Sequence, residues 1–259
     1  MPFVKRKPEP FGLEIKNIVD ADSGCMLFME LQEGKVRMAR KRYCRTHKAT
    51  TACTLRLIRG CNVDERNVAE EDLVKRVAVG DSWFASAETV AAVKTEFNVS
   101  FVGCVKTATK MFPMDAMRHT LATLKRGESL VFYSEELKMH AVGWHDHYYK
   151  TYVGNCFTSG NGLDASKKRQ RDDGSNFYIP VKRPAMVEEI QNCGQSIDGH
   201  NQLRQGVLKL EKYWKVKKWY KRMLTSMMSS CIVDAFRIWE HAYPPVGAEG
   251  VHGSRVVSF

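Results

Sequence analysis

The sequence lacks several features that would assign it to common classes of protein. Its eight cysteines are scattered and none forms a CxxC pair, which argues against a zinc ribbon or a redox motif. The basic residues 1–7 are followed by no apolar segment, so no signal peptide is expected. The most apolar late stretch, residues 219–243, includes Lys221, Asp234 and Arg237, which excludes a membrane span. We therefore expect a reducing, intracellular compartment, no membrane partner and free thiols.

Acidic residues are outnumbered by basic ones. The chain of 259 residues has 40 Lys and Arg against 29 Asp and Glu, a net charge of +11 with a pI near 9.3. This surplus favours an anionic partner, of which nucleic acid is the commonest. The alternative is a basic surface without a partner.

Helical and strand patterns alternate over the first half of the chain. Residues 13–19 and 25–31 read as a hairpin around the turn at Asp22–Gly24. Further segments are assigned from apolar periodicity and from Gly or Thr punctuation. They are predicted helices at 49–60, 86–95 and 114–124 and predicted buried strands at 77–79 and 99–105.

The second half changes character. Residues 130–155 are rich in β-branched and aromatic residues and predict two or three antiparallel strands, while residues 159–176 have the composition of a loop. After Pro184 the chain reads as helical, and its tail beyond Pro244 as frayed. A helical stripe is predicted to be core: Met223, Met227, Cys231, Ala235 and Ile238. The pattern favours a mixed α/β core with an insertion.

Two aspartates lie at the ends of predicted strands. Asp81 directly follows the apolar Val77–Gly80 stretch, and Asp20 ends the first strand. Ligands gather at the carboxyl ends of strands in open α/β sheets, and close carboxylates need a cation such as Mg²⁺ between them. The alternative is that both acids are turn formers or helix caps.

Four segments, taken in order, resemble the transposase domain of piggyBac-type elements. They are KPEPFGLEIKNIVDADSGCMLFMELQEGK (7–35), TTACTLRLIRG (50–60), VGDSWFASAETVAAV (79–93) and VKRPAMVEEIQNCGQSIDGHNQLRQG (181–206). The helices predicted at 213–240 resemble the next helical segment of that family. The resemblance covers residues 7 to 243, and the order of motifs is more specific than any one of them.

The resemblance implies a fold and a chemistry. The fold is α/β, with a ribonuclease-H-like core, a small antiparallel β insertion and a C-terminal helical segment. The implied activity is cutting and joining DNA by metal-dependent phosphoryl transfer, in the nucleus. The implied catalytic and metal-binding residues are Asp20, Asp81 and Asp198, holding Mg²⁺ or Mn²⁺, with Trp83 and Phe84 wedging the next helix onto the sheet.

The same family pattern implies a division of the chain. Residues 7–125 would form the first part of the core and residues 126–180 the β insertion with its basic loop. Residues 181–243 would complete the core, and residues 244–259 would be the tail.

The sequence also departs from the family. Asn201 stands where the family often has a fourth acid, and Gln195-Ser196 stands where it has a glycine pair. Gly199 is expected to weaken a helix that starts there. The family's N-terminal DNA-binding and dimerising region and its zinc module are expected to be absent, so a homodimer is expected only with that region. The alternative function is a domesticated or decayed, non-catalytic DNA-binding protein.

Three further clusters are candidates for binding. Residues 204–222 alternate basic and aromatic residues, and we predict a DNA-binding helix with its aromatics inside. The proposed DNA contacts are Arg204, Lys209, Lys212, Lys215, Lys217, Lys218, Lys221 and Arg222. A nuclear localisation patch is predicted at Lys167, Lys168, Arg169 and Arg171, with an ordinary charged loop as the alternative. The metal-ligand types His140, His145, Asp146 and His147 are interpreted as surface residues.

Overall fold

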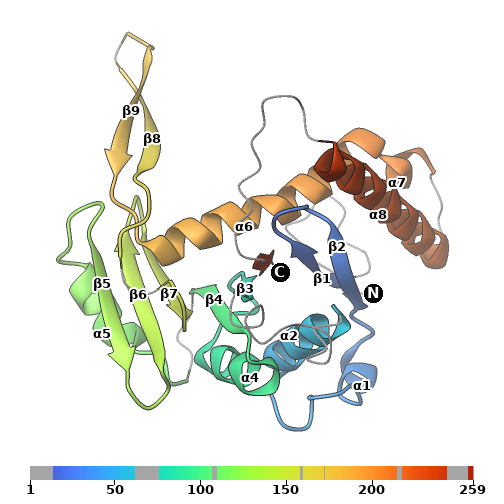
Figure 1. Cartoon of the computed structure of the whole chain (residues 1–259), viewed down its shortest axis with the longest axis horizontal. Coiled ribbons are helices and arrows are strands. Elements are labelled where there is room, and N and C mark those ends of the chain that lie inside the picture. The colour runs from blue at the N-terminus through green and yellow to red at the C-terminus, as the bar shows by residue number, and fades with distance from the viewer. Residues whose placement is uncertain are drawn as a thin grey trace. The chain divides into compact units, whose positions relative to one another are not determined.

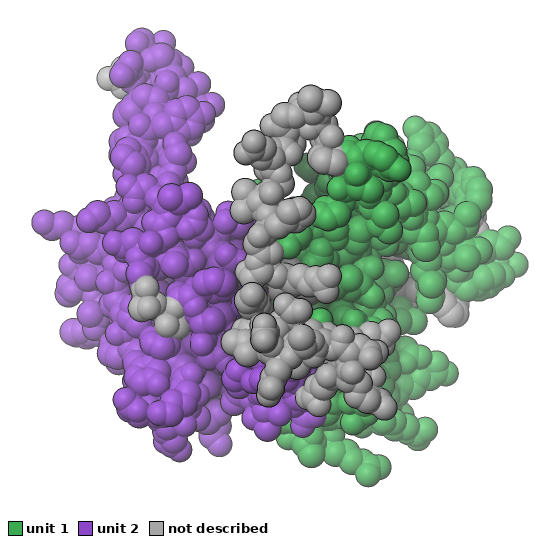
Figure 2. Space-filling model, viewed as in Figure 1, with its two compact units in different colours: residues 1–76, 193–259 green, residues 77–192 purple. Residues whose placement is uncertain are grey.

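The computed structural model describes residues 14–61, 76–106, 110–157, 160–171, 173–214, 218–243 and 256–258. The chain divides into two compact units (Figure 2). Unit 1 comprises residues 1–76 and 193–259, and unit 2 comprises residues 77–192. Helix α6, Ala185–Gln202, carries the chain from unit 2 into unit 1. Elements are labelled as in Figure 1.

Unit 1 is built on the predicted hairpin. Strands β1 and β2 pair antiparallel from Ile15↔Leu31 onward, with an irregularity between Ile18 and Val19. Ile18 and Val19 are fully buried, and the apolar face of α2 contributes Leu55 to the same core. The elements of this unit other than α6 are β1 Ile15–Asp20, β2 Met26–Leu31, α1 Lys35–Met38, α2 Ala49–Gly60, η2 Leu203–Leu208, α7 Leu210–Tyr213, α8 Trp219–Ala242 and β10 Val256–Ser258.

A buried ion pair fixes α2 against the hairpin. Arg56 donates from Nε and Nη2 to the two carboxylate oxygens of Glu30, at 2.6 and 2.8 Å, and Glu30 is only 7% exposed. Burial raises the pKa of Glu30, but the hydrogen bond and charge of Arg56 and the charge of Lys41 outweigh it and hold that pKa below its ordinary value. The two-pronged geometry makes α2 and β2 one packing unit.

The end of the chain differs from its prediction. Residues 244–255 lie outside the described part, but β10 pairs with β1 through Val19↔Ser258 and Asp20↔Val257. The prediction of a frayed tail is wrong for these residues. The physical reason is that β1 offers its second edge, the one not used by β2, to a short β-branched segment.

Helix α8 buries a different face from the one predicted. Met227 is 42% and Ile238 60% exposed, whereas Thr225, Ser229 and Val233 are at most 2% exposed. Ser229 Oγ donates to the Thr225 carbonyl at 2.8 Å, so its hydroxyl is satisfied within the helix and can be buried. Small hydroxyl residues thus face the unit, and the predicted core stripe is wrong. Within the described part of the chain no helix could span a membrane.

Unit 2 contains a mixed sheet. Its order is β3-β4-β7-β6-β5, in which β3 and β4 are parallel and the other neighbours antiparallel. Helix α4 packs on β4 and β7, and α5 packs on β5, β6 and β7. The predicted buried strands and the antiparallel insertion are confirmed. The elements are β3 Val77–Gly80, α4 Ala87–Phe97, β4 Ser100–Val105, α5 Met114–Leu121, β5 Ser129–Ser134, β6 Met139–His145 and β7 Tyr149–Gly154.

The stretch predicted as a loop is a second, separate hairpin. Strands β8 Ala165–Gln170 and β9 Asn176–Val181 pair antiparallel over their full length and extend beyond the five-stranded sheet (Figure 1). The loop prediction is wrong because Lys and Arg, which are poor strand formers, hide a period-two pattern. Lys167 and Arg169 are half-buried opposite Ile179 and Phe177, whereas Lys168 between them is exposed.

Asp146 links this hairpin to the sheet of unit 2. The side chain, 8% exposed, accepts hydrogen bonds from Arg126 at 2.9 Å and Lys167 at 3.0 Å, and Lys150 Nζ lies 3.7 Å away. Trp144 Nε1 also donates to the Lys182 carbonyl at 3.0 Å. The interpretation of Asp146 as a surface residue is therefore wrong, because three cations in tertiary contact compensate for its burial.

These contacts make the stability of unit 2 depend on pH. Burial raises the pKa of Asp146, but the hydrogen bonds from Arg126 and Lys167 and the charges of Lys167 and Lys150 lower it from 3.8 to about 2. The resulting stabilisation is complete above the unfolded pKa and is lost as the pH falls from about 4 to about 2. We expect Asp146→Asn to lower the free energy of unfolding by about 2 kcal/mol at neutral pH.

Urea unfolding at a series of pH values measures this effect. The curves of wild type and Asp146→Asn should converge as the pH approaches 2. The matched control is Glu135→Gln, whose carboxylate is 86% exposed in its pair with Lys138 and should change stability by less than about 1 kcal/mol at every pH. An advantage of wild type that persists to pH 2 would contradict the assignment.

Candidate active site

Asp20 lies where the sequence predicts it, at the carboxyl end of β1. Its Oδ2 accepts hydrogen bonds from the Ser23 backbone N–H at 2.8 Å and from Ser23 Oγ at 2.6 Å. These bonds close the turn into β2, as the turn-former alternative requires. Oδ1 accepts no bond from a described residue, so one oxygen is available to a ligand.

Asp81 follows β3 directly and is exposed. Its Oδ1 accepts the Trp83 N–H at 2.7 Å, and the ring of Trp83 meets that of Phe84 edge to face with centroids 4.8 Å apart. Phe84 is 5% exposed. A Cβ at Gly80 would lie 2.6 Å from the ring of Phe101, so glycine is required immediately before the acid. The buried aromatics therefore hold the backbone that presents Asp81 to solvent.

Asp198 lies on α6 and is exposed. Two residues earlier, Ser196 Oγ donates to the Ala21 carbonyl at 3.0 Å, so this part of α6 contacts the residue that follows Asp20. Unit 1 thus brings the elements carrying Asp20 and Asp198 together. Gln195, Ser196 and Gly199 all lie inside α6, which begins at Ala185, so no helix starts at Gly199.

A buried pair beside Asp198 was missed by the sequence analysis. His200 is fully buried, and its Nε2 lies 3.2 Å from Asp234 Oδ1. The same Asp234 oxygen accepts the Met26 N–H at 2.7 Å. One carboxylate of α8 therefore connects α6 with the first residue of β2. The only signal in the sequence is the spacing of His200 two residues after Asp198.

Arg237 crosses the same region one turn further along α8. A Cβ at Gly199 would lie 3.2 Å from its Nη2, and a Cβ at Gly24 would lie 3.3 Å from its Nε. Both glycines therefore leave room for the guanidinium, which also donates from Nη1 to Glu240 at 2.7 Å. Gly199 thus serves the packing of α6 against Arg237 of α8. Burial, together with the charges of Asp234 and Asp20, raises the pKa of the Cys25 thiol beside this network.

Asn201, at the position of the family's fourth acid, contacts Arg204. Arg204 Nη2 lies 3.4 Å from Asn201 Oδ1, and its Nη1 contacts Glu211 and Ser226, both at 2.5 Å. Arg204, predicted to contact DNA, thus connects η2 with α7 and α8. An acid at position 201 would face this guanidinium, whereas Asn201 accepts from it without a charge.

The three predicted ligands are divided between the two units. No group of three or more His, Cys, Asp or Glu side chains there is arranged to hold a metal ion. Asp20 and Asp198 belong to unit 1 and Asp81 to unit 2. The convergence of the triad stays a prediction.

The basic stretch 204–222 has three of its aromatics on the outside. Tyr213 is 73%, Trp214 52% and Tyr220 49% exposed, so the prediction that these aromatics pack inside is wrong. Lys212, Lys218, Lys221 and Arg222 are exposed as well, and Lys209 is half-buried. Lys215 and Lys217 lie outside the described residues. Exposed aromatics beside lysines retain the composition of a nucleic-acid surface.

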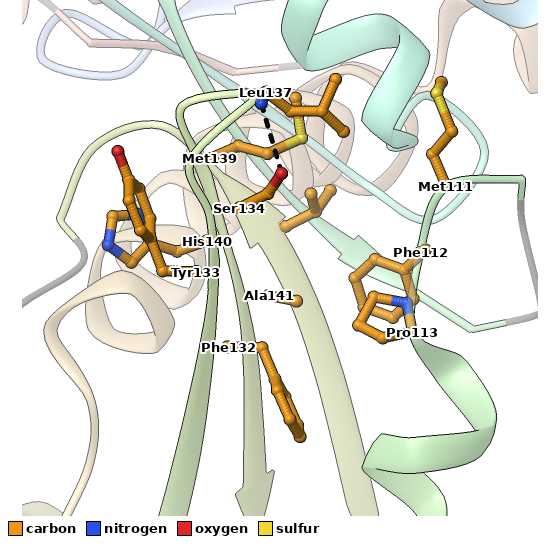
Figure 3. Close-up of a pocket in the computed structure, with 11 residues that line it drawn as sticks. Met111, Phe112, Pro113, Phe132, Tyr133, Ser134, Leu137, Met139, His140 and Ala141 are labelled. Atoms are coloured by element: carbon orange, nitrogen blue, oxygen red, sulfur yellow. Dashed lines mark hydrogen bonds between the residues drawn. The ribbon is translucent and has the colours of Figure 1, made fainter.

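Unit 2 also contains an apolar pocket of about 210 Å³ (Figure 3). Tyr133 and His140 lie together on one side, with ring centroids 4.5 Å apart, and Phe112 and Pro113 lie on the other. The pocket is smaller than the roughly 300–1,000 Å³ typical of ligand sites. No carboxylate lines it, so it does not belong to the acidic site.

Comparison with known proteins identifies the class to which this arrangement belongs. The fold is similar to that in a solved structure described as a cryo-EM structure of a piggyBac transposase synaptic complex with hairpin DNA, with a TM-score of 0.67 and 14% identity. The match covers 96% of this chain and 45% of that one. The predicted fold class is confirmed: the chain has the α/β fold of a transposase.

A family model gives the more particular assignment. The model of the family Transposase IS4 matches residues 2–236, and the chain belongs to that family. A search of curated proteins finds no match.

The Asp234 link predicts a specific loss of stability. Asp234→Ala removes the acceptor of both Met26 N–H and His200 Nε2, and we expect a cost of about 1–3 kcal/mol in the free energy of unfolding. Asp234→Asn keeps an oxygen acceptor and should recover most of it. The control on the same helix is Glu240→Ala, which breaks an ion pair whose side chains are 26% and 41% exposed, at a cost below about 1 kcal/mol. Equal losses in Asp234→Ala and Glu240→Ala, measured by thermal melts, would contradict the link.

Proposed function

We propose that the chain is a piggyBac-type DNA transposase domain that carries out metal-dependent phosphoryl transfer on DNA. The observation that carries the proposal is the placement of Asp20 and Asp81 at the ends of β1 and β3, in a chain of the transposase family. Asp198, on a helix held against the end of β1, supplies the third carboxylate. DNA is the proposed partner, and the nucleus the proposed compartment.

The donor set fits a hard divalent cation. Each of the three carboxylates retains an oxygen that accepts no hydrogen bond from a described residue, and carboxylate oxygens are the ligands preferred by Mg²⁺ and Mn²⁺. When bound, two such ions supply an activated attacking oxygen and a stabilised leaving oxygen on phosphorus.

The chain's own residues would set the geometry of this reaction. Ser23 orients Asp20 by two hydrogen bonds, and the Trp83 N–H orients Asp81. Asp234 and Ser196 hold α6 against the hairpin and thereby position Asp198. Positioning supplies much of the rate in phosphoryl transfer, so these contacts would determine activity as much as the carboxylates do.

A second candidate is a non-catalytic DNA-binding protein. Asn201, which contacts Arg204, favours this candidate, because a neutral amide stands near Asp198 where the family often has an acid. The chain spans 45% of the length of the piggyBac transposase it resembles. We propose weak activity or none for this chain alone.

Metal binding provides the first test. With Mg²⁺ or Mn²⁺ at about ten times its dissociation constant, binding should stabilise the fold by about 1.4 kcal/mol, or roughly 3–5 °C in melting temperature. Asp81→Asn should abolish this shift, yet without metal it should melt no lower than wild type because it removes a repelling charge. Asp115→Asn, at an exposed acid on α5, should keep the full response. A wild type indifferent to millimolar metal would exclude the metal site.

Strand cleavage provides the second test. With Mn²⁺ and supercoiled plasmid we expect slow nicking by the wild-type chain, lost in Asp20→Ala, and no excision of an element from a donor plasmid. Nicking that persists in Asp20→Ala would be contamination and would favour the non-catalytic candidate. Efficient excision would show that the chain needs no further segments.

A further inference from the structure

The β8–β9 hairpin is a separate, projecting element of unit 2 (Figure 1). Its strands form a two-stranded sheet of their own, and it projects from the rest of the unit (Figures 1 and 2). Tyr178 is 63% and Ile179 40% exposed on β9. An isolated two-stranded hairpin is marginally stable in water, so a projecting hairpin with exposed aromatic surface suggests a partner.

The basic residues of this hairpin fall into two groups. Lys167, near the base, is occupied by Asp146 at 3.0 Å and lies 5.5 Å from the Trp144 ring. Lys168 and Arg171 are exposed and Arg169 is half-exposed, and no carboxylate among the described residues pairs with any of them. The outer half thus carries three cations without an acidic partner among the described residues, whereas the inner lysine is paired with Asp146.

The two strands hold these cations in a fixed array. In the register of the hairpin Lys168 faces Tyr178 and Arg169 faces Phe177 across the strands. The Arg171 guanidinium lies 5.2 Å from the centre of the Phe177 ring, and Arg169 Nη1 donates to the Lys168 carbonyl at 3.0 Å. The Phe177 ring therefore limits the conformations of Arg171, and the Lys168 carbonyl limits those of Arg169, before any ligand binds.

The acidic turn decides the direction of approach. Asp173 is exposed at the tip, where its Oδ1 accepts the Ser175 N–H at 2.8 Å. A negative charge at the tip disfavours insertion of the tip first into a polyanion. The flanks, with their cations, favour an approach along the length of the strands.

We propose that the outer half of the β8–β9 hairpin is a contact surface for duplex DNA. The outer half of two six-residue strands spans roughly 10 Å, about three base pairs, and the major groove admits a two-stranded ribbon. Lys168, Arg169 and Arg171 would contact phosphates flanking the groove, and Tyr178 the backbone or base edges. The inference rests on the proposed function, because it takes DNA as the substrate. It also gives the predicted localisation patch a different role.

Salt-dependent binding tests the surface. The variant Lys168→Gln, Arg169→Gln, Arg171→Gln should lower the slope of log K against log salt by about 2 to 3 on a random-sequence duplex, measured by fluorescence anisotropy. The matched control is Lys94→Gln, Arg118→Gln, Lys138→Gln, which removes the same charge from exposed positions elsewhere in unit 2 and should change the slope by less than 1. Lys167→Gln should lower the melting temperature but leave the slope nearly unchanged.

Photocrosslinking locates the contact independently of charge. The variant Tyr178→p-benzoylphenylalanine should crosslink to labelled duplex, whereas Tyr148→p-benzoylphenylalanine, at a 70% exposed position in the same unit, should not. Crosslinking that single-stranded DNA competes away better than duplex would overturn the choice of duplex.

The outcomes separate the two proposals. If the wild-type chain binds no DNA, the proposed function fails and the hairpin proposal fails with it. If wild type binds with a steep salt dependence but the hairpin triple variant behaves like its control, only the hairpin proposal is overturned.

Discussion

The carboxylate of Asp234 is the contact on which the candidate site most depends. It accepts hydrogen bonds from the first residue of β2 and from the fully buried His200 of α6, so three elements distant in sequence meet at one oxygen. Hydrogen bonds to a charged acceptor in a partly buried setting are stronger than the same bonds would be in water. Because Asp20 lies at the end of the hairpin and Asp198 two residues before His200, this contact sets how the two acids can approach.

Unit 2 uses the same physical device for another purpose. Asp146 collects Arg126, Lys150 and Lys167 around one nearly buried carboxylate and so joins a projecting hairpin to a sheet. A carboxylate so placed is stable only while its cations are present, and losing any of them leaves a buried charge. The base of the hairpin is thereby fixed, while its outer cations stay available to a partner.

The parts of the fold that were predicted correctly are those governed by local pattern. The hairpin, α2 and the buried β3 and β4 follow from alternation, runs of apolar residues and glycine punctuation, and Asp20 and Asp81 do lie at strand ends. The predictions failed where contacts with other parts of the structure outweighed a local sequence preference. Basic residues form β8 because Ile179 faces Lys167 and Phe177 faces Arg169, and α8 turns Ser229 inward because its hydroxyl bonds to the helix itself.

The sequence by itself indicated a transposase family, the order of elements in the first half of the chain, and two aspartates at strand ends. These features follow from short motifs and their spacing, which can be recognised without knowing any tertiary contact. Only the tertiary structure decided that His200 and Asp234 form a pair, that Arg204 is occupied by Glu211 and Ser226, and that the run around Lys168 is a projecting hairpin. Each of these depends on which distant residue arrives at a given side chain. The sequence alone does not indicate whether a charged or hydroxyl side chain will contact another residue or water.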